Sequence, residues 1–452
     1  MRKLRVARAL LPGGWAADVV IALEDGVIAS VEIGGDADGA ERWVGIAVPG
    51  LPNLHSHTFQ RGMAGLSEAR GPTEDSFWTW REVMYRFLDQ LSPDDVEAMA
   101  TLAFVEMLET GFTAVAEFHY LHHAPDGRPY ANPAAMAERI AAAAAATGIG
   151  LTLLPVLYRW GGFDRTPPTP GQRRFLSGDD EAFARLVEAS GRAIAGAPDA
   201  RLGIAPHSLR AVGPVELRFA AALAPCGPVH IHAAEQEREV ADCIAWSGSR
   251  PVEWLLAEMD LDERWCLVHA THMTPREARD LAASGAVAGL CPVTEANLGD
   301  GIMPATAYLE AGGRFGVGTD SNILIGAADE LRGLEYAQRL RDRRRSRLAR
   351  SGHSVGRTLF DAAAEGGARA CDRRVGALAP GRQADILLLD GDHPSLAGRD
   401  GDALLDGFVF AAGRCAIRDV IVGGRHVVQD GRHVLREQAR KAFTAALTRI
   451  LA

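Results

Sequence analysis

The sequence predicts an α/β protein, namely a (β/α)8 TIM-type barrel with a small β-sandwich domain formed from both chain termini. Eight short apolar segments alternate with helical stretches between about residues 50 and 325, which is typical of such a barrel. The two ends instead show strand-like runs with turn glycines, such as VVIALEDGVIASVEIGG and AIRDVIVGGRHVVQDGR. A chain of 452 residues is also too long for one ordinary core.

The barrel strands are expected in eight segments, several of which end in polar side chains. In chain order they are GIAVPGLPNLHSH, FTAVAEFHY, IGLTLLPVLY, RLGIAPHSL, GPVHIHAAE, WCLVHATH, AVAGLCPVT and RFGVGTDSN. Helical runs between them end at glycines that suit a helix C-cap, as at Gly148 and Gly285. We therefore expect residues 1–48 and 376–452 to form the β-sandwich domain and a terminal helix, and residues 49–375 to form the barrel.

Composition excludes several classes of function. Lysine occurs only as Lys3 and Lys441, so the central region offers none for a Schiff base, a P-loop or a carboxylated bridge between two metals. The net charge of −10 argues against nucleic acid as a partner. No apolar run is long enough to span a membrane and no signal peptide is evident, so we expect a cytoplasmic protein with reduced cysteines.

Three strand ends carry side chains that suit a metal ion. His55 and His57 lie two residues apart on the first strand and can face the same way. His232 ends the fifth strand and Asp320 the eighth. Each signal is weak alone, since an H-x-H pair is often a surface pair and Asp320 could equally be a helix cap. Together they predict one Zn²⁺ with an open position for water, although iron or manganese suits the same ligands.

Two further residues are candidates for proton transfer and charge stabilisation. Glu235 follows His232 by three residues and could move protons between a water and a leaving nitrogen, unless it is an exposed residue at a helix start. His269 ends the sixth strand and could stabilise the intermediate, unless it is a buried structural histidine. His230 is expected to be a packed core residue and His272 a loop residue.

These residues resemble the amidohydrolase superfamily, with H-x-H after strand one, histidines on strands five and six and aspartate after strand eight. Longer segments are similar to the formimidoylglutamate deiminase family, above all NLHSHTFQRGMAGL, DSFWTWREVMYRF, TAVAEFHYLHH, HIHAAEQ and TEANLGDGI. The resemblance implies metal ligands at His55, His57, His232 and Asp320. It implies proton-transfer or polarising roles for Glu235, His269 and Asp320. It implies substrate contacts at Gln60, Arg81, Tyr120, His207 and Arg210.

The reaction implied by the resemblance converts N-formimino-L-glutamate and water to N-formyl-L-glutamate and ammonia, in histidine degradation. Such a small-molecule dicarboxylate needs cationic anchors, and Arg81 and Arg210 are candidates because guanidinium binds carboxylate bidentately. Asn322 departs from the family, in which histidine is frequent at that position. Relatives are often homodimers, and we expect the same here. Alternatives are a guanine or thioadenosine deaminase, a hydrolase that releases formamide, and a non-catalytic ligand-binding barrel.

Overall fold

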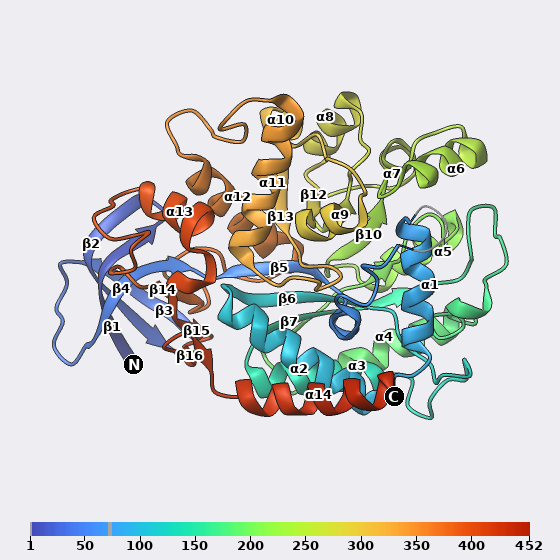
Figure 1. Ribbon diagram of the computed structural model, residues 1–452, viewed down its shortest axis with the longest axis horizontal. Coiled ribbons are helices and arrows are strands. Elements are labelled where there is room, and N and C mark those ends of the chain that lie inside the picture. The colour runs from blue at the N-terminus through green and yellow to red at the C-terminus, as the bar shows by residue number, and fades with distance from the viewer. Residues whose placement is uncertain (1, 71–74) are drawn as a thin grey trace.

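The computed structural model describes residues 2–70 and 75–452 and contains a parallel barrel beside a separate β-sheet (Figure 1). The barrel strands occupy eight positions around the ring, and the fourth position is split into two short strands. They are β5 (Leu51–Ser56), β6 (Phe112–His119), β7 (Gly150–Leu157), β8 (Arg201–Leu202), β9 (Ala205–Pro206), β10 (Val229–Ala233), β11 (Trp265–His269), β12 (Val287–Leu290) and β13 (Arg314–Val317). The predicted barrel is therefore confirmed.

The barrel closes through backbone pairing at two seams. Strands β5 to β8 pair in one run and β10 to β13 in another. Parallel bridges join Ile204 to Val229 at one seam and Ser56 to Asp320 at the other. The split between β8 and β9 falls at Gly203, where an added Cβ would lie 2.6 Å from Leu154 Cδ2 and from Pro228 O. The close approach of neighbouring strands therefore requires glycine there.

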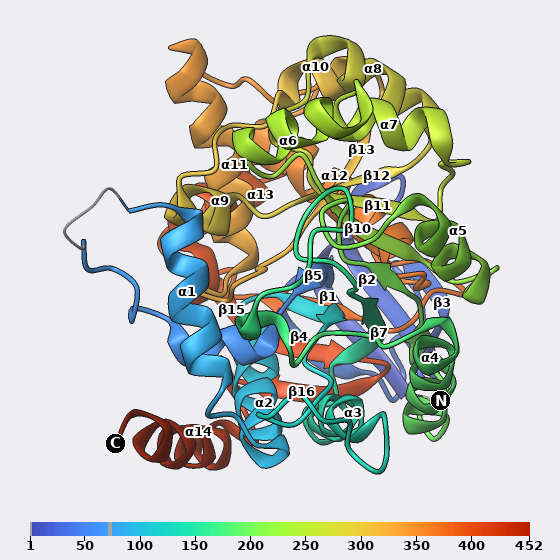
Figure 2. The same ribbon diagram turned by 90° about the vertical axis from the view of Figure 1, so that its right-hand side faces the viewer.

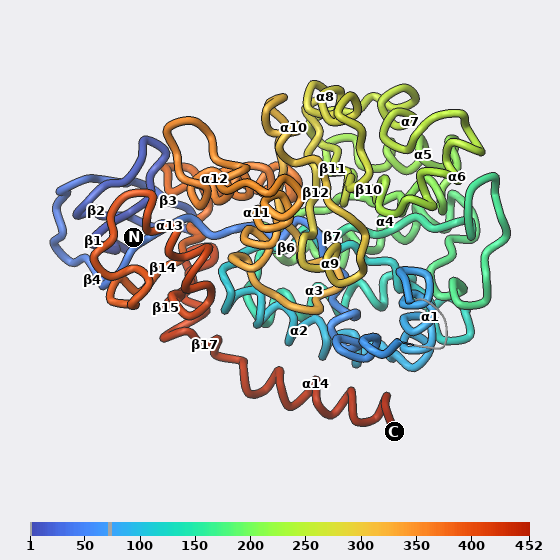
Figure 3. The backbone as a smooth tube through the Cα atoms, turned by 45° about the horizontal axis from the view of Figure 1, so that its top comes forward, coloured from blue at the N-terminus to red at the C-terminus, as the bar shows by residue number. Residues whose placement is uncertain are grey.

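Both chain termini contribute to one eight-stranded sheet beside the barrel, seen at the left of Figures 1 and 3. Its strands are β1 (Arg2–Leu11), β2 (Gly14–Glu24), β3 (Val27–Ile33), β4 (Glu41–Pro49), β14 (Ile386–Leu389), β15 (Ile417–Val422), β16 (Arg425–Gln429) and β17 (Arg432–His433). Strand β4 lies between β1 and β14, so it joins the N-terminal strands to the C-terminal ones.

The first expected strand, residues 45–57, is two strands in the structure. It breaks at Pro49–Gly50, where Gly50 N donates to Asp385 O at 3.0 Å. The portion before the break belongs to the terminal sheet, and β5 after it belongs to the barrel. A Pro-Gly pair is a turn signal that the continuous apolar run obscures.

Helices surround the barrel and cover its outer face (Figures 1 and 2). The α-helices of the described residues are α1 (Phe77–Leu88), α2 (Pro93–Glu109), α3 (Ala135–Thr147), α4 (Asp180–Ile194), α5 (Pro214–Leu223), α6 (Glu237–Ser247), α7 (Pro251–Glu258), α8 (Pro275–Ser284), α9 (Pro292–Leu298), α10 (Ala305–Glu310), α11 (Ala327–Asp342), α12 (Val355–Ala370), α13 (Ala403–Gly407), which lies beside the terminal sheet, and α14 (Arg436–Leu451). The expected C-caps are left-handed, with φ of 81° at Gly148 and 86° at Gly285. Helix α14 crosses below the barrel and packs on α2.

The apolar core fills the barrel and the layer between its strands and helices, and a smaller cluster lies in the terminal sheet. Within the described residues no helix has both the length and the apolar character needed to cross a bilayer. At the carboxyl end of the barrel, the loops that follow the strands converge on a set of buried polar residues.

Candidate active site

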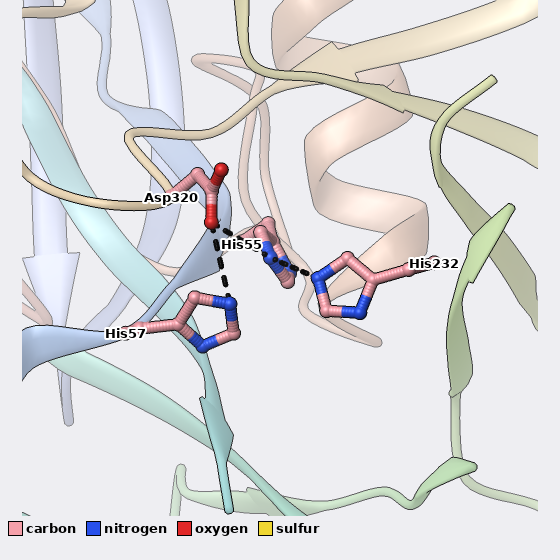
Figure 4. A group of neighbouring side chains, drawn as sticks. All are labelled: His55, His57, His232 and Asp320. Carbon is pink, nitrogen blue, oxygen red and sulfur yellow. Dashed lines mark hydrogen bonds and ion pairs between the residues drawn. The ribbon is translucent and has the colours of Figure 1, made fainter. Parts of the chain in front are cut away.

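The four candidate metal ligands converge at the carboxyl end of the barrel (Figure 4). His55 lies on β5 and His57 directly after it, His232 lies on β10, and Asp320 follows β13. Asp320 Oδ1 lies 3.4 Å from His55 Nε2 and 3.2 Å from His57 Nε2, and the Nε2 atoms of His55 and His232 are 3.1 Å apart. All four side chains are buried, and one ligand atom from each lies within 4.8 Å of the others.

The backbone orients two of these imidazoles. His57 Nδ1 lies 2.9 Å from Phe118 O, and His232 Nδ1 lies 3.0 Å from His207 O. A carbonyl oxygen only accepts, so each Nδ1 carries the hydrogen and each Nε2 presents a lone pair to the centre of the cluster. Burial lowers the pKa of His55 to about 3 and keeps the pKa of His232 well below 6.5. Neutral imidazoles with one carboxylate are the donors that zinc requires.

Glu235 and His269 lie beside this cluster. His269 Nε2 is 3.7 Å from Glu235 Oε1 and 4.0 Å from Asp320 Oδ2, while its Nδ1 is 3.4 Å from Glu295 Oε1. Burial works to lower the pKa of His269, but the three carboxylates raise it to about 10. Burial raises the pKa of Glu235, against the effects of His269 and Arg210. The pair can therefore share a proton next to the metal ligands. Glu235 is only 5% exposed, which contradicts the alternative of an exposed residue at a helix start.

Five residues at this end of the barrel have an unusual backbone conformation. Ala234, His269, Ala270, Asp320 and Asn322 all have positive φ, between 44° and 69°. Non-glycine residues are strained in this region, and such strain persists only where surrounding contacts hold it. The strand-end loops of β10, β11 and β13 are thus held in the conformations that direct their side chains inward.

One cavity brings together three of the four candidate metal ligands and all five expected substrate residues. Gln60, Arg81, Tyr120, His207 and Arg210 line it with His57, His232, Glu235, His269 and Asp320. Its remaining walls are mostly aromatic or apolar, and they include Phe77, Trp80, Tyr85, Tyr158, Phe175 and Leu298. Arg81 reaches the cavity from helix α1.

The two arginines have different environments. Arg210 Nη2 donates to Glu235 Oε2 at 3.1 Å, and its Nε lies 3.8 Å from Glu239 Oε2. Arg81 stacks over Trp78 at 4.7 Å and over Tyr85 at 5.6 Å. Within the described ranges the Nε of each guanidinium is buried without a hydrogen-bond partner. Both groups therefore keep donor capacity for an anion in the cavity.

Gln60 and Tyr120 form a pair on the wall of the cavity. Gln60 Nε2 donates to Tyr120 Oη at 2.7 Å, and the Tyr120 hydroxyl lies 3.4 Å from Met84 Sδ. Gln60 Oε1 has no hydrogen-bond partner among the described residues and is buried. The amide is thus held by its nitrogen, and its oxygen is left to accept from a ligand.

Asn322 ties together the backbone that carries the ligands. Its Nδ2 donates to His57 O and Asp320 O at 3.1 Å each, and its Oδ1 accepts from Thr319 Oγ1 at 2.6 Å. The side chain is fully buried and makes no direct contribution to the ligand set. The asparagine at this position therefore holds the backbone of two metal ligands, His57 and Asp320, and is not itself a ligand.

Several residues of the site were missed from the sequence. Glu239 accepts from the backbone N–H groups of Ala234 and Glu235 at 3.1 Å each, and Glu295 holds His269 from behind. Asp300 is 5% exposed, and burial raises its pKa to about 9. Glu117, in the middle of β6, also has its pKa raised, to about 7, by burial. Of these, only Glu117 had a visible signal, a carboxylate inside an apolar strand.

The two histidines that were not expected in the site, His230 and His272, lie outside the cavity. His230 is fully buried on β10, and its Nε2 lies 2.8 Å from Ala370 O, outside the active-site cavity. This confirms a packed core histidine. His272 lies in the loop after β11, and it does not line the cavity either.

Comparison with known proteins gives concordant matches over the whole chain. The Amidohydrolase family matches residues 46–427, and the formimidoylglutamate deiminase HutF N-terminal domain matches residues 4–44. A formimidoylglutamate deiminase from Pseudomonas aeruginosa is 54% identical over 100% of both chains. A 5-methylthioadenosine/S-adenosylhomocysteine deaminase from Natronomonas pharaonis is 29% identical, over 92% of this chain and 89% of its own. The crystal structure of an amidohydrolase from Brucella melitensis superposes with a TM-score of 0.96 at 53% identity, over 100% of both chains.

Proposed function

The chain belongs to the amidohydrolase family, and from this premise we propose that it hydrolyses N-formimino-L-glutamate to N-formyl-L-glutamate and ammonia in histidine degradation. The relative that is 54% identical over its full length is a formimidoylglutamate deiminase. The observation that carries the proposal is a single cavity in which two arginines face a buried His/His/His/Asp cluster. A substrate with two carboxylates and one amidine-like end needs that combination.

Members of this family depend on a metal, and His55, His57, His232 and Asp320 have the donor chemistry to hold one divalent ion, for which we propose zinc. The fit rests on the two imidazoles whose Nδ1 hydrogens are fixed by backbone carbonyls, which leaves both Nε2 lone pairs available to an ion among the four ligand atoms. When bound, such an ion supplies a Lewis acid that makes water a nucleophile at neutral pH.

The arginines bind and orient the substrate. Arg210 is paired with Glu235 at 3.1 Å, so a substrate carboxylate that reaches Arg210 competes with this contact and frees the Glu235 carboxylate for proton transfer. Arg81 offers its guanidinium from α1, on a different wall of the cavity. The same cavity wall also offers the hydrogen-bonding groups of Gln60, Tyr120 and His207. Binding at two walls fixes the position of the formimino carbon and lowers the entropic part of the barrier.

Glu235 moves the proton. Its carboxylate accepts a proton as water attacks the formimino carbon and delivers it to the terminal nitrogen, with Asp320 as a second nearby acceptor. The hydroxyl proton of the tetrahedral intermediate then follows the same route to this nitrogen, so that the nitrogen leaves as ammonia and the carbon becomes the formyl group. His269 is held by Glu295 with its Nε2 toward Glu235 and Asp320. As an imidazolium it stabilises the negative charge that develops at the reacting centre.

The test is ammonia release from N-formimino-L-glutamate by the metal-loaded protein, with product identification by mass spectrometry. We expect N-formyl-L-glutamate and ammonia. Glutamate and formamide would show cleavage of the other C–N bond. 5′-Methylthioadenosine belongs in the same panel because a relative of 29% identity is a 5-methylthioadenosine/S-adenosylhomocysteine deaminase, and guanine belongs there as the other alternative substrate of the sequence analysis. Faster turnover of either purine would overturn the proposal.

A further inference from the structure

A second hollow adjoins the active-site cavity and opens outward between α1, α6 and the loop after β7. Arg81 and Arg210 are the residues that line both spaces, so their guanidinium groups form the boundary between them. The outer hollow is further lined by Trp78 from α1, by Arg238, Asp242, Ala245 and Trp246 from α6, and by loop residues 161–164 and 166. Helices α1 and α6 lie near each other on one rim of the barrel (Figures 1 and 2).

Two guanidinium groups, those of Arg81 and Arg238, pack against the indole ring of Trp78. Arg81 Cζ and Arg238 Cζ each lie 4.7 Å from the centroid of its ring. The attraction between a cation and an aromatic face fixes such groups without using their N–H donors. One indole therefore links an arginine of the inner cavity to an arginine of the outer hollow.

Within residues 2–70 and 75–452, Arg238 has one acidic partner and donates no hydrogen bond to a side chain. This partner is Asp242, one turn along α6, with Nε and Oδ2 3.6 Å apart and side chains that are 66% and 52% exposed. That distance is longer than a hydrogen bond, and exposed pairs of this kind stabilise a helix weakly. A carboxylate that enters the hollow can thus bind the Arg238 fork without breaking a strong contact.

We propose that Arg238, held on Trp78, is an outer docking residue for a carboxylate of the substrate, which then passes inward to Arg81 and Arg210. This rests on the proposed function, since it assumes an anionic substrate. The whole chain carries a net charge of −10, which repels a dianion over the Debye length. Among the residues that line the hollow, three arginines outnumber the two carboxylates of Asp164 and Asp242, so this lining attracts an anion to the entrance.

The experiment compares kcat and KM for N-formimino-L-glutamate in wild type, Arg238→Gln, Arg238→Lys and Arg276→Gln, at low and high ionic strength. Arg276 is a matched control, because it pairs with Asp280 at i,i+4 on α8, with Nε and Oδ2 3.5 Å apart and an exposure of 81%. Arg238→Gln should lower kcat/KM by about 3- to 10-fold at roughly 10 mM salt while kcat changes less than about twofold. Arg238→Lys should retain most of kcat/KM because it keeps the charge.

At about 0.5 M salt the Debye length falls to a few ångströms, so the gap between Arg238→Gln and wild type should close. The docking role is refuted if Arg238→Gln matches Arg276→Gln at low salt, or if its loss is the same at both salt concentrations. It is also refuted if Arg238→Lys is as impaired as Arg238→Gln. A wild-type protein that releases no ammonia from this substrate would instead refute the proposed function, so the two failures are distinct.

Discussion

Replacing Glu235 with glutamine tests the proton transfer on which the proposed reaction depends. Glutamine has nearly the same shape, and its amide oxygen can still accept from Arg210 Nη2, which lies 3.1 Å from Glu235 Oε2. Arg210 also keeps Glu239, at 3.8 Å from its Nε. The substitution therefore removes a titrating group from the cavity without leaving a buried charge isolated.

The expected loss follows from the position of this carboxylate. Glu235 Oε1 lies 3.7 Å from His269 Nε2, beside the cluster, yet it is outside the set of four ligand atoms. Proton transfer by a positioned side chain contributes about 10²- to 10⁴-fold to a rate. That range corresponds to about 3 to 5 kcal/mol of activation free energy. Glu235→Gln should thus lower kcat by at least about 100-fold while metal content stays unchanged.

The assay is steady-state ammonia release, with metal content measured on the same preparations. Glu237→Gln is the matched control, because Glu237 lies two residues away on the exposed side of α6 and should leave kcat as in wild type. If Glu235→Gln keeps more than about a tenth of the wild-type kcat at equal metal content, the shuttle role is wrong. If metal content falls instead, Glu235 contributes to the metal site.

Three further results are expected. His232→Ala should lose most of the bound metal after dialysis, because it removes one of four ligands; full occupancy by elemental analysis would contradict the assigned centre. Arg81→Gln should raise KM by about 10- to 100-fold with a smaller change in kcat, because that factor corresponds to the loss of one charge-assisted hydrogen bond to the substrate. An unchanged KM would show that Arg81 does not bind the substrate. Burial raises the pKa of Asp385, whose Oδ1 accepts from Gly423 N at 2.9 Å, so wild type loses stability as pH rises from near 3.8 through the raised value. The melting temperature of Asp385→Asn relative to wild type should therefore increase as the pH rises from about 4, and a difference that is already constant from about pH 4 upward would show an ordinary pKa.

The barrel could be predicted because its strands are buried on both faces and so form short apolar runs. Polar side chains at the ends of such runs stand out, which is why His55, His57, His232 and Asp320 could be singled out from sequence. The structure brings these four together, although their separation along the chain is as large as 265 residues, from His55 to Asp320. Fold class and the order of the motifs were sufficient for that prediction.

The carboxylates behind the site could not be predicted for a physical reason. Glu239 and Glu295 each lie in the first turn of a helix, in α6 and α9. Acidic residues are favoured there by the helix dipole in any protein, so the sequence pattern is that of an ordinary solvated helix start. Only their burial distinguishes them, and burial depends on how the strand-end loops fold over each other.

The geometry of the barrel seam makes the metal site part of barrel closure. His57 N donates to Asp320 O at 2.9 Å, and Asp320 N donates to His55 O at 3.0 Å. These backbone bonds join the first strand position to the last, and they place the side chains of the same residues around one point. Asn322 strengthens the seam by donating to His57 O and Asp320 O. An ion that binds His55, His57 and Asp320 therefore crosslinks the two ends of the sheet, and its binding free energy adds to the stability of the closed barrel.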